Sequence, residues 1–156
     1  MVLNGDVYIG AGSRIEVAQE AVLTFGGKVA NSAGLTLICG DRITIGDNTV
    51  ISWETLIIDT DFHYVLNIEQ GKTHPMRRPI EIGKEAWLCT GSKVLKGSKL
   101  PDGCILSAGS VLNKKYEESN CLLAGNTAVI VRRNVKRSDR EVQSIENKNE
   151  ESIRIS

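Results

Sequence analysis

The stretch that decides the fold runs from residue 82 to residue 111 and can be written in lines of six: IGKEAW LCTGSK VLKGSK LPDGCI LSAGSV. The first place of every line is aliphatic and the fifth place is small. The small residues are Ala86, Ser92, Ser98, Cys104 and Ser110. Neither the 3.6-residue period of a helix nor plain alternation explains a strict period of six. The pattern therefore predicts a repeat architecture.

The geometry of β-strands explains a period of six residues. If each hexad forms one short strand and one turn, its first and fifth residues point inward and three hexads close a triangular coil. Stacked coils then share backbone hydrogen bonds. An all-β sandwich of short strands is the alternative, but hairpin signals such as Asn-Gly between alternating runs are absent. We therefore predict an all-β solenoid, a parallel β-helix of hexapeptide repeats.

The same frame recurs upstream and is interrupted once. It is occupied by Ile9, Ile15, Ile45, Ile51 and Ile57. Over residues 21–39 the first place weakens, so the repeat is expected to be degenerate there. The step from Ile57 to Ile82 shifts the frame by one residue, so residues 59–79 are expected to be looped out as an insertion.

The chain changes character near its C-terminus. Residues 136–156 are dense in charge and contain no hexads. We expect one domain over residues 1–135 and, over 136–156, a charged tail that is either a short helix or disordered.

The bulk composition narrows the possible functions. The 156 residues suit a single domain. Nineteen basic and nineteen acidic residues give no net charge, which argues against a nucleic-acid or anionic-membrane binder. Nothing resembles a signal peptide or approaches the ~20 apolar residues of a membrane span, so a cytoplasmic location is expected. The four cysteines lack zinc-site or disulfide spacing and are expected to be small buried thiols.

Two segments resemble a known family. The stretches RRPIEIGKEAWLCTGSKVLKGSKLPDGCILSAGSVLNKK (77–115) and LLAGNTAVIVRR (122–133) are similar to the last coils and exit segment of the hexapeptide-repeat acyltransferases, especially the galactoside and maltose type of sugar O-acetyltransferase. The chain departs from the family at Thr127, where proline is common, and at Cys89, where glycine is common.

The resemblance implies a fold, an assembly and a reaction. The fold is a left-handed parallel β-helix, and the assembly is a homotrimer with active sites between subunits. The reaction moves an acetyl group from acetyl-CoA to a hydroxyl of a sugar or polysaccharide precursor.

Acyl transfer to a hydroxyl needs a base that works near neutral pH, and histidine suits this role. His63 lies in DTDFHYV (59–65), inside the insertion, where the resemblance places the family's base. Either Asp59 or Asp61 is expected to orient its ring and stabilise the imidazolium. The sequence leaves open which of the two does so.

The resemblance also implies contacts to the acetyl donor. Thr90 would lie beside the thioester, and Ala108 would meet the pantetheine arm. Asn113 and Lys114 would follow along that arm. Arg132 would lie near the coenzyme A phosphates, which a guanidinium group binds in a fork.

Three further residues are expected on the acceptor side. His74, in GKTHPMRRP, resembles the His-Pro of the serine O-acetyltransferase branch and is expected to contact substrate. Trp87 is expected either to cover the acceptor or to pack between subunits. Asn31 lies roughly where galactoside-type enzymes hold the sugar.

Other functions remain open on the residues alone. Carbonic anhydrases of this fold gather three histidines around zinc, but this chain has two histidines, so no metal is expected. The acceptor could instead be an amine, as in amino-sugar N-acetylation, or a serine hydroxyl. A non-catalytic hexapeptide scaffold that binds proteins is the alternative from another class.

Overall fold

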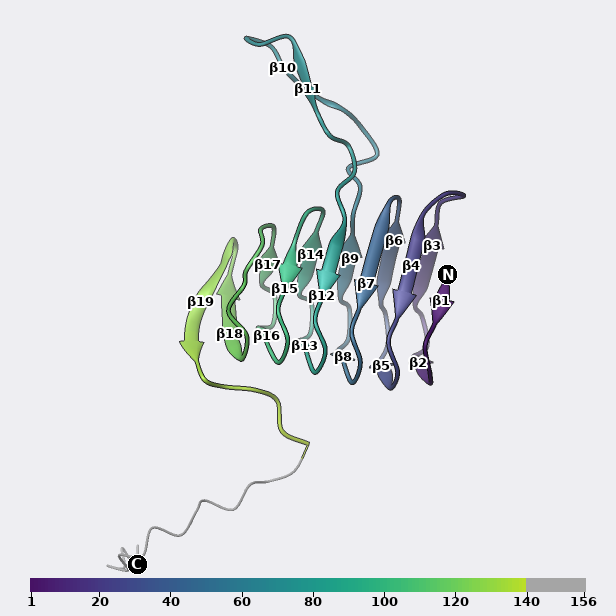
Figure 1. The fold of residues 1–156 in the computed structure, drawn as a ribbon, viewed down its shortest axis with the longest axis vertical. Helices are drawn as coiled ribbons and strands as arrows, with labels where there is room; N and C mark the ends of the chain where they lie inside the picture. The colour runs from purple at the N-terminus through teal and green to yellow at the C-terminus, as the bar shows by residue number, and fades with distance from the viewer. Residues whose placement is uncertain (140–156) are drawn as a thin grey trace, which may run out of the picture.

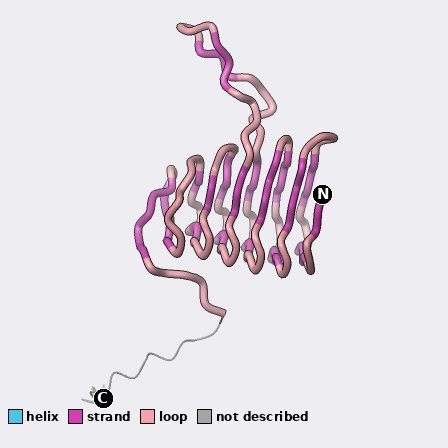
Figure 2. The backbone as a smooth tube through the Cα atoms, viewed as in Figure 1, coloured by secondary structure: helices cyan, strands magenta, loops and turns pink. Residues whose placement is uncertain are grey.

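The computed structural model describes residues 1–139, which form short strands and turns without a helix. The chain winds through three parallel sheets in turn, so that successive coils stack along one axis (Figures 1 and 2). The expected left-handed β-helix of hexapeptide repeats is confirmed, and an insertion loops out of it beyond a bridge between Thr60 and Arg77. No helix within residues 1–139 is long and apolar enough to cross a membrane.

Each face of the solenoid is one sheet. Sheet A consists of β1 (Val2–Leu3), β4 (Val22–Phe25), β7 (Arg42–Ile45), β12 (Ile80–Ile82) and β15 (Lys99–Leu100). Sheet B consists of β2 (Val7–Ile9), β5 (Val29–Asn31), β8 (Val50–Ile51), β13 (Trp87–Leu88), β16 (Ile105–Leu106), β18 (Cys121–Gly125) and β19 (Ala128–Arg133). Sheet C consists of β3 (Arg14–Val17), β6 (Thr36–Cys39), β9 (Leu56–Ile58), β14 (Lys93–Leu95) and β17 (Val111–Leu112).

Three columns of side chains, one behind each sheet, run along the inside of the coils. Register places Leu3, Phe25, Ile45, Ile82 and Leu100 in the first column. The second column holds Ile9, Asn31, Ile51, Leu88, Leu106 and Leu123. The third holds Ile15, Leu37, Ile57, Val94 and Leu112. From the second coil onward every member is buried, because each coil covers the next.

The register of these columns corrects the expectation that the repeat is degenerate over residues 21–39. Residues 21–39 are regular hexads in a shifted frame rather than degenerate ones. Phe25 lies ten residues after Ile15, and Ile45 lies eight after Leu37, where six would keep the frame. The two longer corners add up to one whole hexad, so the frame returns at Ile45 and hides the shift.

The insertion leaves the solenoid at the corner between sheets C and A, which we call the C/A corner. Its middle is an antiparallel hairpin of β10 (Val65–Asn67) and β11 (Lys72–His74), which projects well away from the coils (Figure 1). A bridge between Thr60 and Arg77 closes its stem. The coils on either side stack on each other regardless of the insertion, since β12 pairs directly with β7.

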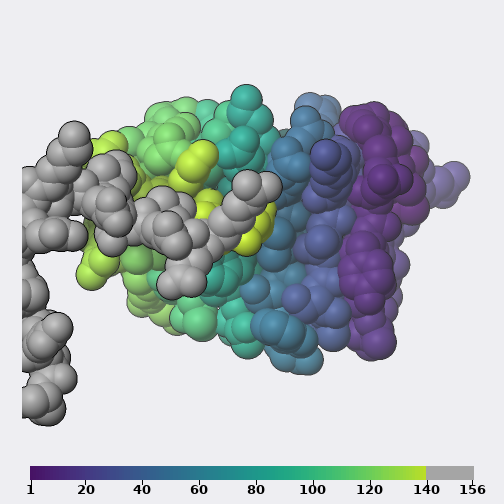
Figure 3. Space-filling model, turned by 90° about the horizontal axis from the view of Figure 1, so that it is seen from below, coloured from purple at the N-terminus to yellow at the C-terminus, as the bar shows by residue number. Residues whose placement is uncertain are grey.

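At the other end, β19 turns back and pairs antiparallel with β18. The exit segment after β19 then runs back over the outside of the coils (Figure 3). There Lys136 approaches Glu85 at 3.7 Å, and Arg137 Nη2 donates to the Asn48 carbonyl at 3.1 Å. Residues 136–139 form neither helix nor strand, and the remainder of the predicted tail lies outside the described residues.

Candidate active site

The first aspartate of the insertion is a structural residue. Asp59 is fully buried, and its two carboxylate oxygens accept backbone hydrogen bonds from Gly40 at 2.5 Å and Asp41 at 2.9 Å. A carboxylate shared between two amides of the preceding coil fixes the stacking of that corner. The expectation that Asp59 orients His63 is therefore corrected, because both of its oxygens are engaged inside the solenoid.

The second aspartate faces outward and is held by a lysine. Asp61 Oδ2 forms an ion pair with Lys96 Nζ, a side chain on the turn after β14. The same ammonium group donates to the Pro75 carbonyl at 2.8 Å, on the returning strand of the insertion. Within residues 1–139 the other Asp61 oxygen has no hydrogen-bond partner, and the ion pair gives the carboxylate a defined position.

His63 is exposed on the stem of the insertion. It follows Phe62, a non-glycine residue with a positive φ of 59° that turns the chain sharply. Within the described residues, the imidazole has no hydrogen bond or ion pair that would occupy it. Such a group can accept a proton from a substrate that docks beside the stem.

A groove of about 270 Å³ lies at the foot of the insertion and is lined by Thr60 and Phe62 but not by His63. Ile38, Phe62 and Met76 give it apolar walls, and Arg77 adds a charge at its rim. Cys39 lines it as well. Burial, and then the nearby Asp59 charge, raise the pKa of the Cys39 thiol to about 11. The thiol is therefore neutral near pH 7 and is a poor nucleophile.

The residues predicted to meet the thioester and pantetheine lie at a different corner. Thr90 and Ala108 are exposed on the turns between sheets B and C, the B/C corner. The turns there stack directly, since Gly91 N donates to the Trp53 carbonyl and Gly109 N to the Thr90 carbonyl, both at 2.9 Å. The indole of Trp53 is 55% exposed beside Thr90.

The other predicted donor contacts are spread around the last coils. Asn113 and Lys114 follow β17 at the C/A corner. Asn113 Nδ2 donates to Thr127 Oγ1 at 3.3 Å, and the Lys114 ammonium lies 5.4 Å from the centre of the Tyr116 ring. Arg132 is exposed on β19. Sheet C therefore separates Thr90 and Ala108 from the corner that carries His63 within one chain.

Two of the predicted acceptor residues do not lie near His63. Asn31 is buried in the second inner column, where it accepts from Gly10 N and Ser13 Oγ and donates to the Ile51 carbonyl. It replaces an aliphatic residue of the core and cannot reach a sugar, so that prediction is corrected. Trp87 lies on the outer face of sheet B, and its Nε1 donates to Ser52 Oγ at 3.0 Å. His74 is exposed on β11, opposite Val65.

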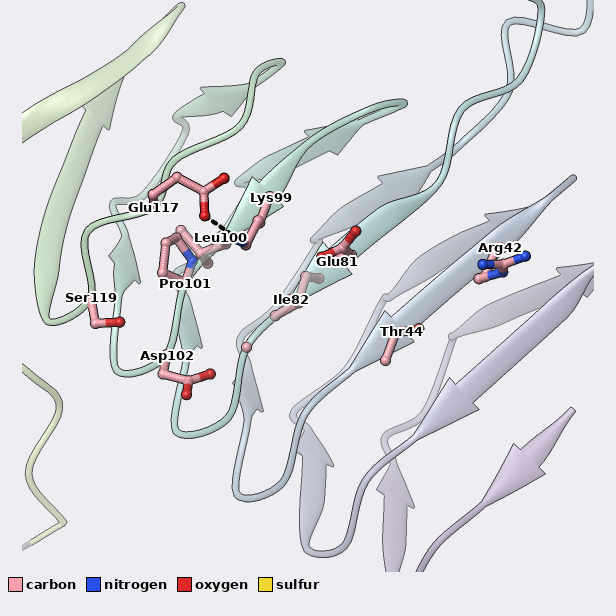
Figure 4. A pocket seen from close by; sticks show the side chains of 11 residues that line it. Arg42, Thr44, Glu81, Ile82, Lys99, Leu100, Pro101, Asp102, Glu117 and Ser119 are labelled. Carbon is pink, nitrogen blue, oxygen red and sulfur yellow. Dashed lines mark hydrogen bonds and ion pairs between the residues drawn. The ribbon is translucent and has the colours of Figure 1, made fainter.

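A larger recess of about 490 Å³ lies on the outside of sheet A. Figure 4 shows its charged side chains, among them the Lys99–Glu117 ion pair. Charges of both signs line it, and none of the predicted site residues belongs to it. Residues 1–139 contain no group of three or more side chains placed to hold a metal ion.

Comparisons with known proteins bear on the fold and on sequence similarity. No protein-family model matches the chain. The polysialic acid O-acetyltransferase of Escherichia coli O1:K1 is 25% identical over 133 residues, which are 85% of this chain and 41% of that protein. Relatives and solved structures that resemble this chain are O-acetyltransferases of the hexapeptide-repeat type. The chain spans about half the length of the curated relatives it matches.

Solved O-acetyltransferases of this type share the fold. The polysialic-acid-specific acetyltransferase NeuO superimposes with a TM-score of 0.76 at 24% identity, covering 91% of this chain and 68% of that one. Galactoside acetyltransferase in complex with coenzyme A gives 0.66 at 21% identity, covering 88% and 72%.

Sequence reasoning missed Lys96 and the position of Trp53 beside Thr90. Lys96 occupies the third place of its hexad, VLKGSK, where the repeat imposes no residue type. Trp53 was recognisable as outward-facing from its place in the repeat, but its position beside Thr90 depends on how the coils stack.

Proposed function

We propose that this chain transfers an acetyl group from acetyl-CoA to a hydroxyl of a sugar or polysaccharide precursor, with His63 as the general base. The observation that carries the proposal is an exposed imidazole, without an intramolecular partner among the described residues, on the one insertion of a hexapeptide β-helix. The named relatives support the reaction class, since they acetylate polysialic acid and galactosides.

Few side chains take part in the proposed acetyl transfer. His63 takes the proton of the acceptor hydroxyl while that oxygen attacks the thioester carbonyl. Asp61, held by Lys96, stabilises the imidazolium through its remaining oxygen. The tetrahedral intermediate collapses with loss of the coenzyme A thiolate, which takes the proton from the imidazolium.

The developing oxyanion needs a donor at the B/C corner. The Thr90 amide suits this role because it donates no backbone hydrogen bond to another described residue, whereas its neighbours Gly91 and Ser92 do. Thr90 and Ala108 would hold the thioester and pantetheine, with Asn113, Lys114 and Arg132 further along the donor. Coenzyme A bound to the galactoside relative supports acetyl-CoA as co-substrate.

The site is completed by a second copy of the chain. Sheet C separates the B/C corner from the insertion, so His63 meets a donor only if another subunit presents its B/C corner. The outer face of sheet B offers a contact surface, because Val50, Trp87, Ile105 and Leu122 form an unbroken apolar row in register. The two surfaces differ, so the association is head-to-tail and closes as a ring, for which we propose a homotrimer.

Turnover of acetyl-CoA against a panel of sugars, amino sugars, serine and polysialic acid tests the function. We expect turnover with a hydroxyl acceptor, and a loss on the order of 100- to 10,000-fold for His63→Ala. Coenzyme A binding by that variant should be unchanged. Full activity of His63→Ala would contradict the base assignment, and absence of both turnover and coenzyme A binding would contradict the function.

A further inference from the structure

The insertion has few ties to the solenoid beyond its first residues. Its stem is closed by backbone hydrogen bonds from Arg78 to Asp59 at 3.1 Å and from Asp61 to Met76 at 2.9 Å. A two-stranded hairpin is only marginally stable by itself, and this one carries exposed apolar side chains such as Leu66 and Ile68. Something on the solenoid must therefore fix its direction.

Lys96 is the residue placed to do so. Among the described residues it is the only one outside the insertion that hydrogen-bonds to residues 61–76. Its ammonium contacts both strands of the stem at once, through Asp61 on the outgoing strand and the Pro75 carbonyl on the returning strand.

The burial of this contact makes it stronger than an ordinary surface ion pair. The Lys96 side chain is 21% exposed, and the Asp61 side chain is 39% exposed. The Lys96–Asp61 ion pair is partly shielded from solvent, and the Lys96 ammonium also donates to the Pro75 carbonyl. The pair therefore keeps one geometry better than a freely solvated ion pair does. By contrast, the Lys84–Asp102 pair joins neighbouring coils at 4.0 Å with both side chains more than half exposed.

We infer that Lys96 is a positioning residue, which clamps the stem of the insertion and fixes the Asp61 carboxylate, two residues before His63 in the chain. The inference rests on the proposed function. Lys96 itself takes no part in the proton transfer. It acts through Asp61, whose second oxygen is left for the imidazole, and through the backbone at Pro75, which sets where the stem points.

Three variants test the clamp: Lys96→Met removes the ammonium group, Lys96→Arg keeps the charge, and Lys84→Met removes a lysine from the pair outside the site. The first readout is amide hydrogen exchange of residues 61–76 in the free protein. We expect faster exchange in Lys96→Met, recovery toward wild type in Lys96→Arg, and wild-type exchange in Lys84→Met.

The second readout is steady-state kinetics with acetyl-CoA and the panel acceptor that turns over fastest. Lys96→Met should lower kcat on the order of 10- to 100-fold, because a misplaced base loses its attack geometry. The KM for acetyl-CoA should stay within about twofold, since the Lys96 ammonium contacts Asp61 and Pro75 and none of the proposed donor residues.

Unchanged exchange in Lys96→Met would overturn the clamp. Faster exchange with an unchanged kcat would overturn the positioning role. A wild-type chain without transferase activity would contradict the proposed function, while the exchange comparison would still decide whether Lys96 holds the insertion.

Discussion

Two aspartates two residues apart have opposite roles, and burial separates them. Asp59 is enclosed and serves two backbone amides, whereas Asp61 faces outward and pairs with Lys96. In Asp59→Asn, one of the two amides would face an NH2 group in place of a carboxylate oxygen. We expect a loss of about 1–3 kcal/mol in the free energy of unfolding.

Urea unfolding measures that loss, with Asp61→Asn as the matched control. The control should lose no more than about 1 kcal/mol, because its ion pair is partly exposed. It should instead lower kcat. Equal stability losses in both variants would contradict the distinction between the two aspartates.

The Cys39 thiol predicts a pH dependence of stability. Burial, and then the Asp59 charge, raise its pKa from 9.0 to about 11 in the folded chain. Between these values the unfolded chain loses the proton and the folded chain keeps it, so the stabilisation is complete below pH 9 and is lost as the pH rises toward 11. The stability difference between wild type and Cys39→Ala should therefore shrink from pH 8 to pH 10.5 in urea unfolding. A pH-independent difference would contradict the raised pKa.

At the residue scale the sequence singled out the proposed base but not its neighbours. His63 was found because the hexads on either side mark its segment as an insertion. Asp59 and Asp61 could not be told apart, because their difference lies in burial. Asn31 was misplaced because a shifted frame hid that it belongs to an inner column.

At the element scale, close contact between coils explains several corner glycines. A Cβ on Gly83 would lie 2.5 Å from the Asp102 backbone nitrogen, whereas the nearest heavy atom to a Cβ on Gly27 is 3.6 Å away. Gly83→Ala should therefore cost about 1–3 kcal/mol through overpacking. Gly27→Ala, at the corresponding corner of an earlier coil, should change stability much less. Urea unfolding of the pair checks this, and equal losses would contradict the close-contact argument.

The strands of the solenoid could be predicted wherever the hexad pattern is carried by neighbouring residues. Each hexad carries its own inward-facing residues, so the coils from Ile82 onward can be predicted from the sequence alone. The hairpin inside the insertion was not predicted, because its strands are exposed and leave no periodic apolar signal. Its stem is set by Lys96, which is distant in sequence.

At the scale of the whole molecule, the residues proposed for catalysis are divided between corners. One chain presents His63 at the C/A corner and Thr90 with Ala108 at the B/C corner, with sheet C between them. The sequence predicts both parts, but their separation follows only from the order in which the coils visit the sheets. We therefore propose that each active site belongs to two copies of the chain.

Subunit mixing tests this claim most directly. His63→Ala removes the base, and Ala108→Trp should block the donor corner with a bulky ring, so each variant alone should be inactive. After co-refolding in equal amounts, some interfaces pair an intact His63 with an intact B/C corner. We expect acetyl-CoA turnover to return to a substantial fraction of wild type, on the order of a quarter if subunits mix at random. If the mixed assemblies stay as inactive as the separate variants, the site lies within one chain and the account is wrong.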